Sequence, residues 1–532
     1  MKNKSLNRPI ETIWMITREY EGLAGAGGVK DVSMQLSEAL AASGRRVGVV
    51  MPLYGFMSPR ELGFTIDEGF SFDVDMPYVG LERREHVRIW TKKQKRVVIF
   101  LIDSQRFREK KNIYTYTAED EEENPFNRQG DGHFDYFATN VLLQKAALCL
   151  MILKDEKPDV IHCQDGHTAI LPAIVRETEG FRHYFRNTGL LVTIHNAGLG
   201  YHQEVADLPF AQTICGLPQR AVMANLLNEQ FDPFLAASSY AVLNTVSENY
   251  AHELTETDDD ALTGMLGHQL KTRGVTLHGI TNGINPLDFS PKNPKKTCLF
   301  APFDPAGGEL AGKQQCRAHL VQALAARNVT GVIQHGYLDT RADLPLFTCI
   351  GRLSNQKGLD KLTGALDALM PINLDFQVLI MGTGAMDIEE SLIRMATHPG
   401  NAGRICLLMG YAPHLANQVY AAGDFFLIPS QYEPCGLTDF IAQLFGNLPI
   451  VHHVGGLVKV EDGVTGFAYS EHSSAALMGV MQKAIQIYRN NPAALQVMQL
   501  KAVERIMERY TWEKVMEQYL HLYQQALEMA GG

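Results

Sequence analysis

Several features that would place a protein in a familiar class are missing from this 532-residue chain. None of its eight cysteines forms a CxxC pair and several lie in apolar stretches, so we expect reduced, buried thiols rather than disulfides or a zinc site. There is no HExxH motif, and His162 and His167 lack convincing partner ligands, so we predict that no metal is bound. The formal net charge of −11 argues against nucleic acid as a partner.

Long apolar segments are absent as well. No uninterrupted apolar run approaches the ~20 residues that span a bilayer. The N-terminal "MKNKSLNRPIETIWMIT" is basic, but it has no continuous apolar stretch ahead of a small-residue cleavage site. We therefore predict no signal peptide, no membrane partner and a cytoplasmic location. The acidic run "AEDEEENPFN" (118–127) is predicted to be a solvated loop, with a functional acidic patch as the less favoured alternative.

The first sixty residues show the pattern of a β-loop-α-β unit. The apolar run "TIWMIT" (12–17) predicts a strand and "EYEGLAGAGG" a glycine-rich loop. From Val29, the helical spacing of Val32, Leu36 and Leu40 predicts a helix that ends near Gly44, before a second strand at "RRVGVVMP". Units of this kind build parallel sheets.

Four later apolar runs extend this sheet, and each ends in polar residues. They are "RVVIFLID", "PDVIHCQD", "LLVTIHN" and "AVLNTVS". Continuous apolar character indicates strands that are buried on both faces. Ligands of open α/β sheets bind outside the carboxyl ends of the strands. We therefore expect one rim to carry Asp165, His195, Asn196 and Ser247.

A second α/β domain is predicted after a stretch rich in Pro, Gly and Lys. The length allows two to four domains at roughly 100–200 residues each. We predict an N-terminal Rossmann-like domain over 1–285, an interdomain crossing and the start of the second domain over 286–345, a C-terminal Rossmann-like nucleotide-sugar domain over 346–511, and a C-terminal helix over 512–532. Two doubly wound domains facing each other across a cleft would form a GT-B-like α/β fold. The last helix is amphipathic; one arrangement returns it to the N-terminal domain, although the pattern does not identify its partner.

Three glycine turns follow predicted strands. They contain Gly27 and Gly28 in "GAGGVKDV", Gly382 and Gly384 in "GTGA", and Gly455 and Gly456 in "GGL". Backbone N–H groups at such turns, with the positive end of a helix dipole, suit a phosphate or a developing anion. A tight strand-to-helix turn without a ligand would show the same pattern, so these turns are weak evidence by themselves.

Charged residues at strand ends give a stronger indication. In "GRLSNQKG", Arg352 and Lys357 have the chemistry to neutralise a diphosphate, including the charge that builds on it as it leaves. Glu433 in "SQYEPCGLTDF" has the chemistry to accept hydrogen bonds from sugar hydroxyls and to stabilise an oxocarbenium-like centre. Two surface cations and an acid that only stabilises a helix N-terminus are the alternatives. His195, by itself, could be a buried hydrogen-bonding residue, but Asp165 converges on it from the preceding strand.

Taken together, these stretches resemble the bacterial glycogen synthase and plant starch synthase family of retaining GT-B glucosyltransferases that use ADP-glucose. The similarity runs in the family's order from about residue 12 to 525. It rests on the stretches "GGVKDV", "PLYG", "HCQDGHTAILPA", "TIHNAG", "NTVSENYAHE", "GITNGIN", "GRLSNQKGLD", "YAAGDFFLIPSQYEPCGLTDF", "PIVHHVGGL", "GFAYS" and "YTWEKVMEQY". "EPCGLT" and "RLSNQKG" are the specific ones.

The resemblance implies a role for each matching residue. Arg352 and Lys357 would hold the donor diphosphate, and Glu433 and His195 would lie at the transferred glucose. Further donor contacts would come from Cys435, Gly436, Leu437 and Thr438, in addition to the turn residues Gly27, Gly28, Gly382 and Gly384. Sugar or acceptor contacts would come from Asp31, Asp165, Asn196, Gly455 and Gly456. The reaction would add glucose through an α-1,4 bond to the non-reducing end of a glucan, with a nucleotide-sugar donor, no metal and no other cofactor.

The chain departs from the family pattern in several places. The family's glycine-rich loop begins with a lysine where this chain has Gly25, and Lys30 lies five residues later. After "GGL" the family continues with a small residue and "DTV", whereas this chain reads "VKVEDG". Two departures on the acceptor side are "QDGH" and "NAGLGYHQ". Together, these departures leave two alternative functions open. One is a GT-B transferase with UDP-glucose or another acceptor, and the other is a non-catalytic glycan-binding or regulatory relative. Oligomeric state is not predicted.

Overall fold

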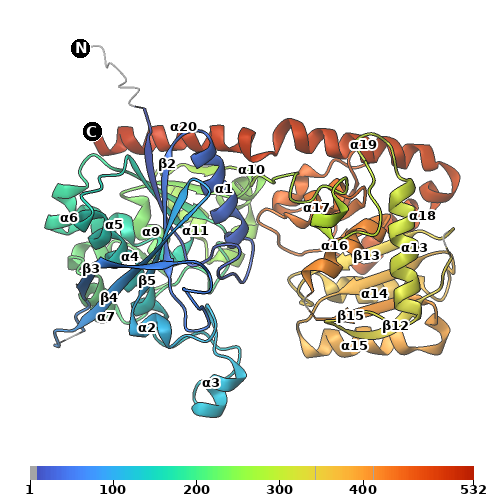
Figure 1. Ribbon diagram of the computed structural model, residues 1–532, viewed down its shortest axis with the longest axis horizontal. Coiled ribbons are helices and arrows are strands. Elements are labelled where there is room, and N and C mark those ends of the chain that lie inside the picture. The colour runs from blue at the N-terminus through green and yellow to red at the C-terminus, as the bar shows by residue number, and fades with distance from the viewer. Residues whose placement is uncertain (1–8, 79, 342, 411, 532) are drawn as a thin grey trace. The chain divides into compact units, whose positions relative to one another are not determined.

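Two large sheets, one in each of two compact units, organise the chain (Figure 1). One unit comprises the residues up to 283 together with those from 512 on, and the other comprises residues 284–511. The computed structural model describes residues 9–78, 80–341, 343–410 and 412–531. Residues 1–8, on which the prediction about a signal peptide partly rests, lie outside the described residues.

The first unit contains a nine-stranded sheet in the order β11-β10-β7-β6-β1-β2-β5-β4-β3. Its strands are β1 (Thr12–Ile16), β2 (Arg46–Pro52), β3 (Thr65–Asp75), β4 (Arg84–Gln94), β5 (Val97–Asp103), β6 (Val160–Gln164), β7 (Gly189–Ile194), β10 (Val242–Thr245) and β11 (Leu277–Gly279). All pairs are parallel except those of β4 with β3 and β5. The register places Ile13 between Val47 and Val160, so β1 lies at the centre of the parallel part.

Helices connect these strands. They are α1 (Val29–Ala42), α2 (Gln105–Arg108), α3 (Ala118–Glu123), α4 (Tyr136–Leu153), α5 (Leu171–Glu177), α6 (Glu179–Tyr184), α7 (Leu208–Cys215), α8 (Gln219–Met223), α9 (Pro233–Ser238), α10 (Glu248–Glu256) and α11 (Leu266–Thr272). A small hairpin of β8 (Leu226–Leu227) and β9 (Gln230–Phe231) lies apart from the main sheet. Every residue of β1, β6 and β7 is buried, as their continuous apolar pattern predicts.

The last helix, α20 (Trp512–Gly531), packs on the first unit although about 230 residues of the second unit precede it in the chain. Trp512, Tyr519 and Tyr523 are buried in the same core as α1 and β1. The Tyr523 hydroxyl lies 3.0 Å from Nδ1 of His162 on β6. The partner that the sequence pattern did not identify is therefore the N-terminal sheet.

Helix α4 is long and apolar enough to cross a membrane, judged by length and composition alone. However, 78% of its apolar window is buried inside the protein. Lys145 on this helix is also buried, and its ammonium donates to the carbonyls of Asp75 and Ile214. These contacts are those of a core helix.

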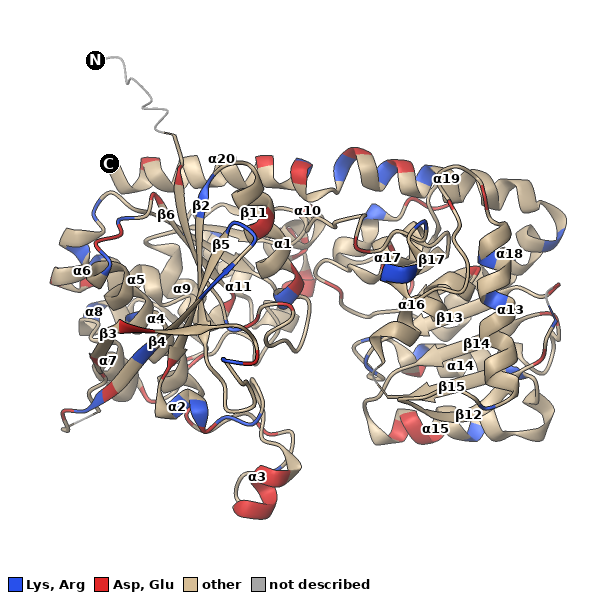
Figure 2. Ribbon diagram, viewed as in Figure 1, with Lys and Arg blue, Asp and Glu red and all other residues tan. Residues whose placement is uncertain are grey.

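The sequence predicts a loop for the acidic run at 118–127, but residues Ala118–Glu123 form the helix α3 (Figure 2). Thr117 and Asp120 form a reciprocal capping box, which supplies the hydrogen bonds that a short helix otherwise lacks. Lys111 pairs with Glu119 and Glu123 and so offsets part of the negative charge. Glutamates 119 and 121–123 remain exposed, in agreement with a solvated segment.

The second unit contains a seven-stranded sheet in the order β12-β15-β14-β13-β16-β17-β18. Its strands are β12 (Ile333–Leu338), β13 (Leu346–Ile350), β14 (Gln377–Met381), β15 (Arg404–Met409), β16 (Phe425–Ile428), β17 (Leu448–His452) and β18 (Phe467–Tyr469). Only the edge strand β12 is antiparallel to its neighbour. The predicted crossing segment 286–345 contributes this strand and α13 (Ala311–Ala325) to the unit.

Both faces of this sheet are covered. Alternate residues of β13 and β14 belong to separate apolar clusters: Phe347 and Val378 to one, and Leu346 and Leu379 to the other. The first cluster includes residues of α14 (Leu359–Leu369), α15 (Met386–Thr397), α18 (Ser474–Asn490) and α19 (Pro492–Arg509), and the second includes residues of α13 and α16 (Pro413–Ala422). The remaining helices are α12 (Pro294–Thr297) and α17 (Thr438–Leu444). The unit is therefore doubly wound, as predicted.

Candidate active site

In the second unit, the predicted motifs follow four adjacent strands. In the order β14-β13-β16-β17, these strands lead into the turn with Gly382 and Gly384, the segment 351–358, the segment 430–438, and the turn with Gly455 and Gly456. All four strands are parallel, so their carboxyl ends share one edge of the sheet. This is the edge at which α/β sheets bind ligands.

Lys357 and Glu433 meet at this edge. The Lys357 ammonium donates to Oε2 of Glu433 at 2.5 Å, and the Ser430 hydroxyl donates to the same oxygen at 3.1 Å. The Lys357 side chain is 27% exposed and the Glu433 side chain 13% exposed, so the pair is partly open to solvent. The fold thus brings together a cation and a carboxylate that lie 76 positions apart in the sequence.

The backbone of Glu433 is hydrogen-bonded to the glycine turn after β17. The N–H of Gly456 donates to the Glu433 carbonyl at 2.9 Å. Gly455 has a φ of +53°, and a Cβ there would lie 2.0 Å from the same carbonyl oxygen. Glycine is thus required both by the conformation and by the close approach of the two segments.

The loop after β13 is joined to the "GTGA" turn after β14. The N–H of Leu353 donates to the Thr383 carbonyl at 2.9 Å, and the N–H of Ala385 donates back to Leu353 at 2.7 Å. A Cβ at Gly384 would lie 2.1 Å from the Leu353 carbonyl oxygen. Arg352, just before Leu353, is exposed, so its guanidinium is accessible to a ligand.

The remaining predicted donor contacts run from Glu433 into α17. Cys435 and Gly436 are buried, whereas Leu437 and Thr438 are partly exposed. A ligand at this edge therefore has direct access to Leu437 and Thr438, while Cys435 and Gly436 shape the loop beneath.

In the first unit, Asp165 holds an unusual position at the end of β6. Its φ of +65° with ψ of 177° is a conformation that costs a non-glycine residue on the order of 1–3 kcal/mol. Its buried carboxylate accepts from the N–H of His195 at 3.2 Å. Burial raises the pKa of Asp165 to about 7, although hydrogen bonds from backbone N–H groups oppose that shift.

His195 and Asn196 follow β7, next to β6, so the structure places them beside Asp165. Ser247, predicted for the same rim, follows β10 on the other side of β7 and caps α10 by accepting from the N–H of Tyr250. Nε2 of His195 lies 2.7 Å from Oε1 of Gln164. Burial lowers the pKa of His195 to about 3, so the ring is neutral at physiological pH. Asn196 is partly exposed, and its Oδ1 accepts from the N–H of Gly198 at 2.8 Å.

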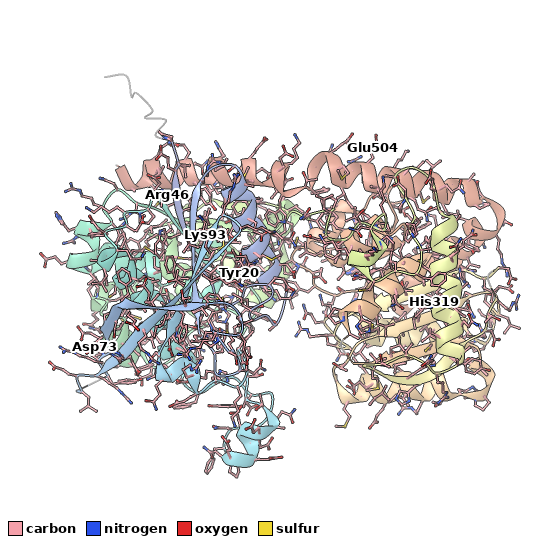
Figure 3. The ribbon with its side chains drawn as sticks, viewed as in Figure 1. Tyr20, Arg46, Asp73, Lys93, His319 and Glu504 are labelled. Atoms are coloured by element: carbon pink, nitrogen blue, oxygen red, sulfur yellow. The ribbon has the colours of Figure 1, made fainter. Side chains whose placement is uncertain are left out.

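In the glycine-rich loop after β1, two backbone N–H groups donate to a carboxylate of the protein itself. Oε2 of Glu19 accepts from the N–H groups of Ala26 and Gly27, at 2.7 and 3.1 Å. The neighbouring Tyr20, labelled in Figure 3, is buried. Its hydroxyl lies 3.3 Å from that of Ser37 on α1. The Gly27 N–H, which the sequence predicts to bind a donor phosphate, therefore donates to Glu19 in this structure. Gly28 is exposed, and it immediately precedes α1.

Lys30 occupies the space above Gly25. A Cβ at Gly25 would lie 2.1 Å from Cδ of Lys30, so the two side chains could not coexist without movement. The Lys30 ammonium pairs with Glu21 and, at 3.1 Å, with Asp31. Asp31 is partly exposed on the first turn of α1, and burial raises its pKa above the ordinary value while Lys30 opposes the shift. The aliphatic part of the Lys30 side chain thus fills the space beside Gly25, while its ammonium is paired with the two carboxylates.

Sequence reasoning missed three contributors to these edges: Glu19, Ser430 and Lys459. Glu19 follows a buried strand just as Asp165 does, so the same rule could have identified it. Ser430 donates to Glu433 only three residues later, whereas Lys459 donates to the carbonyls of Cys435 and Gly436, 24 and 23 residues earlier, a contact that only the fold reveals. No group of three or more His, Cys, Asp or Glu side chains is placed to hold a metal ion among the residues that the structure describes.

Two models of known protein families match parts of this chain. Residues 12–271 match the model of the starch synthase catalytic domain, and residues 344–486 match that of glycosyl transferases group 1. The chain is 31% identical over 530 residues to the glycogen synthase of Anaeromyxobacter dehalogenans, covering 96% of this chain and 98% of the relative. The chain belongs to the glycogen synthase and starch synthase family.

Other members of the family are similarly related. The glycogen synthase of Vibrio cholerae is 28% identical over 535 residues, covering 97% of this chain and 98% of that protein. Among solved structures, the catalytic domain of starch synthase IV from Arabidopsis thaliana, bound to ADP and acarbose, matches with a TM-score of 0.78 and 23% identity over 98% of this chain and all of that one. That similarity supports the GT-B fold. The chain is a glycosyltransferase of the glycogen synthase type, as the sequence motifs predicted.

Proposed function

We propose that this enzyme transfers glucose from ADP-glucose to the non-reducing end of an α-1,4-glucan with retention of configuration. The relatives named glycogen synthase match along the whole chain, and the starch synthase IV structure contains ADP together with acarbose. The donor nucleotide and the acceptor are carried over from these relatives as part of the proposal.

The pairing of Lys357 with Glu433 is the observation that supports this function most directly. A nucleotide sugar presents a diphosphate next to a carbon that becomes electron-poor as the bond breaks. An ammonium and a carboxylate within hydrogen-bond distance of each other match these two charges. Lys357, with the exposed Arg352, would stabilise the leaving diphosphate, while Glu433 would bind the glucose and oppose its positive charge.

The polar residues of the first unit are proposed to bind the sugar and the acceptor. His195 is a poor general base because its pKa is about 3. We propose that it acts as a neutral hydrogen-bonding group, with Asp165 and Asn196 beside it. Transfer on the same face of the sugar, in which the departing diphosphate takes the acceptor's proton, needs no protein base and fits this neutral histidine.

We further propose that the donor and an α-glucan are the enzyme's only substrates, that no metal or other cofactor is required, and that the enzyme works in the cytoplasm without a nucleic-acid or membrane partner. The net charge of −11 supports the part that concerns nucleic acid. Cations on the second unit, such as Lys357 and Arg352, carry the charge neutralisation that a metal provides in other transferases.

A transfer assay with two labelled donors tests the proposal. ADP-glucose and UDP-glucose are each incubated with a glycogen primer, with and without a chelator, and the linkage of the product is determined. We expect transfer from ADP-glucose in α-1,4 linkage, unaffected by the chelator. Transfer from UDP-glucose alone would overturn the assignment of the donor. Glycogen binding without transfer from either donor would instead indicate a non-catalytic relative.

A further inference from the structure

A buried lysine lies directly beneath the loop that carries Glu433. The Lys459 ammonium donates to the carbonyls of Cys435 and Gly436, at 2.5 and 2.7 Å. Its side chain is only 5% exposed, and it contacts the face of the Phe440 ring with Nζ 4.5 Å from the ring centre. The ammonium is therefore hydrogen-bonded to the backbone of this loop rather than to solvent.

The charge of Lys459 is balanced by Asp439, in the first turn of α17. Oδ1 of Asp439 lies 3.2 Å from the Lys459 ammonium, and the aspartate side chain is fully buried. The hydrogen bonds of the ammonium go to the two carbonyls, whereas its contact with Asp439 is an ion pair that leaves both oxygens of the buried carboxylate without a hydrogen bond from the residues that the structure describes. Burial raises the pKa of Asp439 to about 6, and the neighbouring Lys459 opposes that shift.

Such a pair is costly compared with apolar side chains of similar size, because both charges lose their water. Stability by itself therefore explains poorly why two charged groups are buried here. Their location suggests another reason, since the two carbonyls belong to the residues that immediately follow Glu433 and Pro434. The Glu433 carbonyl itself is held by Gly456, three residues before Lys459 in the same chain segment.

We propose that Lys459 is a positioning residue for transfer: by binding the carbonyls of Cys435 and Gly436, it fixes the loop that presents Glu433 to the donor sugar. Asp439 makes this possible by neutralising the buried ammonium. The inference rests on the proposed function of the Glu433 site and adds to it a pair of residues that do not touch the substrate.

Two variants separate positioning from simple charge balance. Lys459→Met leaves Asp439 buried without a counter-ion, so both stability and loop order should fall. The double variant Lys459→Met with Asp439→Leu removes both charges and should recover a melting temperature within a few degrees of the wild type. The double variant still lacks the two hydrogen bonds to the loop.

Hydrogen exchange at the amides of segment 433–437, in which Pro434 alone has no N–H, reports on the loop directly when measured without ligand. In the double variant we expect this exchange to be at least 10-fold faster than in the wild type, and kcat with ADP-glucose to fall by a similar factor. Wild-type exchange and wild-type kcat in a folded double variant would overturn the proposal, because Lys459 would then only balance Asp439.

Lys313 provides a matched control. Its buried ammonium also donates to two backbone carbonyls, those of Ala421 and Phe445 at 2.8 and 3.1 Å, but not to the segment 433–437. Lys313→Met should lower the melting temperature and leave loop exchange and kcat near wild type. If Lys313→Met accelerates exchange of 433–437 as much as Lys459→Met does, general destabilisation explains the effect and the proposal fails.

The exchange measurement also keeps this inference separate from the proposed function. If the wild-type enzyme transfers no glucose from any donor, the proposed function fails. Faster exchange in the double variant would still establish that Lys459 orders the loop, and unchanged exchange would still refute it.

Discussion

At the scale of single residues, Lys357 and Glu433 carry most of the proposed chemistry. We expect Lys357→Ala and Glu433→Ala each to lower kcat/KM with ADP-glucose by about 100-fold or more, because each removes a charge that opposes one forming in the transition state. Partly exposed ion pairs contribute little to stability, so the melting temperature should change by only a few degrees. Steady-state kinetics and thermal melting measure the two effects.

Lys361 offers a control for these variants. It lies four residues after Lys357 and pairs with Asp360 at 2.7 Å, with about a third of each side chain exposed. Lys361→Ala removes a similar ion pair in the first turn of α14, just after the site segment, and we expect near wild-type kinetics. Wild-type rates in both the Lys357 and the Glu433 variants would refute the assignment of the site.

Asp165 predicts a pH dependence of stability. Its folded-state pKa of about 7 lies above the ordinary value of 3.8, so the folded protein holds a proton that the unfolded chain releases between these values. This contribution to the free energy of unfolding is fully present below pH 4, falls as pH rises, and is lost once pH exceeds 7, a change on the order of 4 kcal/mol. Asp165→Asn lacks this titration.

Urea denaturation of wild type and Asp165→Asn at pH 4, 5, 6, 7 and 8 tests this prediction. Other titrating groups are common to both proteins, so the difference between the two curves isolates Asp165. We expect the variant to gain stability relative to wild type as pH rises. A constant difference across the range would show that Asp165 ionises normally.

At the scale of elements, the loop between β13 and α14 depends on Gly358. Its φ is +69°, and a Cβ there would lie 1.8 Å from the Pro429 carbonyl oxygen at the end of β16. Gly358→Ala should therefore force the two loops apart, destabilise the unit by more than about 1 kcal/mol and displace the neighbouring Lys357. Denaturation and the KM for ADP-glucose measure these effects.

The control is the same substitution within a helix. Gly479 lies inside α18, and a Cβ there would meet nothing within 4 Å. Gly479→Ala should stabilise the protein by roughly 0.5–1 kcal/mol, because alanine favours the helix. The two substitutions are chemically identical and are expected to have opposite effects; a loss of stability at Gly479 or none at Gly358 would contradict the argument.

The elements that the sequence predicted well are those whose pattern is simple. The central strands, such as β1, β6 and β14, are continuously apolar because they are buried on both faces. The hairpin of β3 and β4 and the edge strand β12 were not predicted, because they lack the continuous apolar runs that identified the central strands and are exposed along much of their length.

For the candidate site, the sequence predicted which residues follow the strands but not what holds them. Glu433 and Asp165 were identifiable because a polar residue after a buried strand is unusual. The occupation of the Gly27 N–H by Glu19 forms within the single loop after β1, and the residue pattern does not specify the conformation of that loop. The contacts of Lys459 with the Glu433 loop join residues 23 and 24 positions apart, which no local pattern connects. Such contacts follow from the topology of the sheets.

At the scale of the whole molecule, the chain returns to its first unit through α20, so that unit is incomplete until the last residues are present. Five large side chains of α20 are buried in the core of the first unit: Trp512, Val515, Tyr519, Leu522 and Tyr523. Burial contributes about 1.5–3 kcal/mol for each such side chain, and the sum is comparable to the 5–15 kcal/mol that typically stabilises a domain. A chain ending at Thr511 should therefore lose the fold of its first unit.

Hydrogen exchange resolved by segment tests this prediction, because the second unit retains all of its residues in the truncated chain. We expect β1 and β6 to lose their protection, while β13 and β14 keep theirs. Tyr523→Phe serves as the control: it removes only the hydroxyl next to His162 and should cost about 1 kcal/mol without unfolding the unit. Full protection of β1 and β6 in the truncated chain would show that the N-terminal sheet folds without α20.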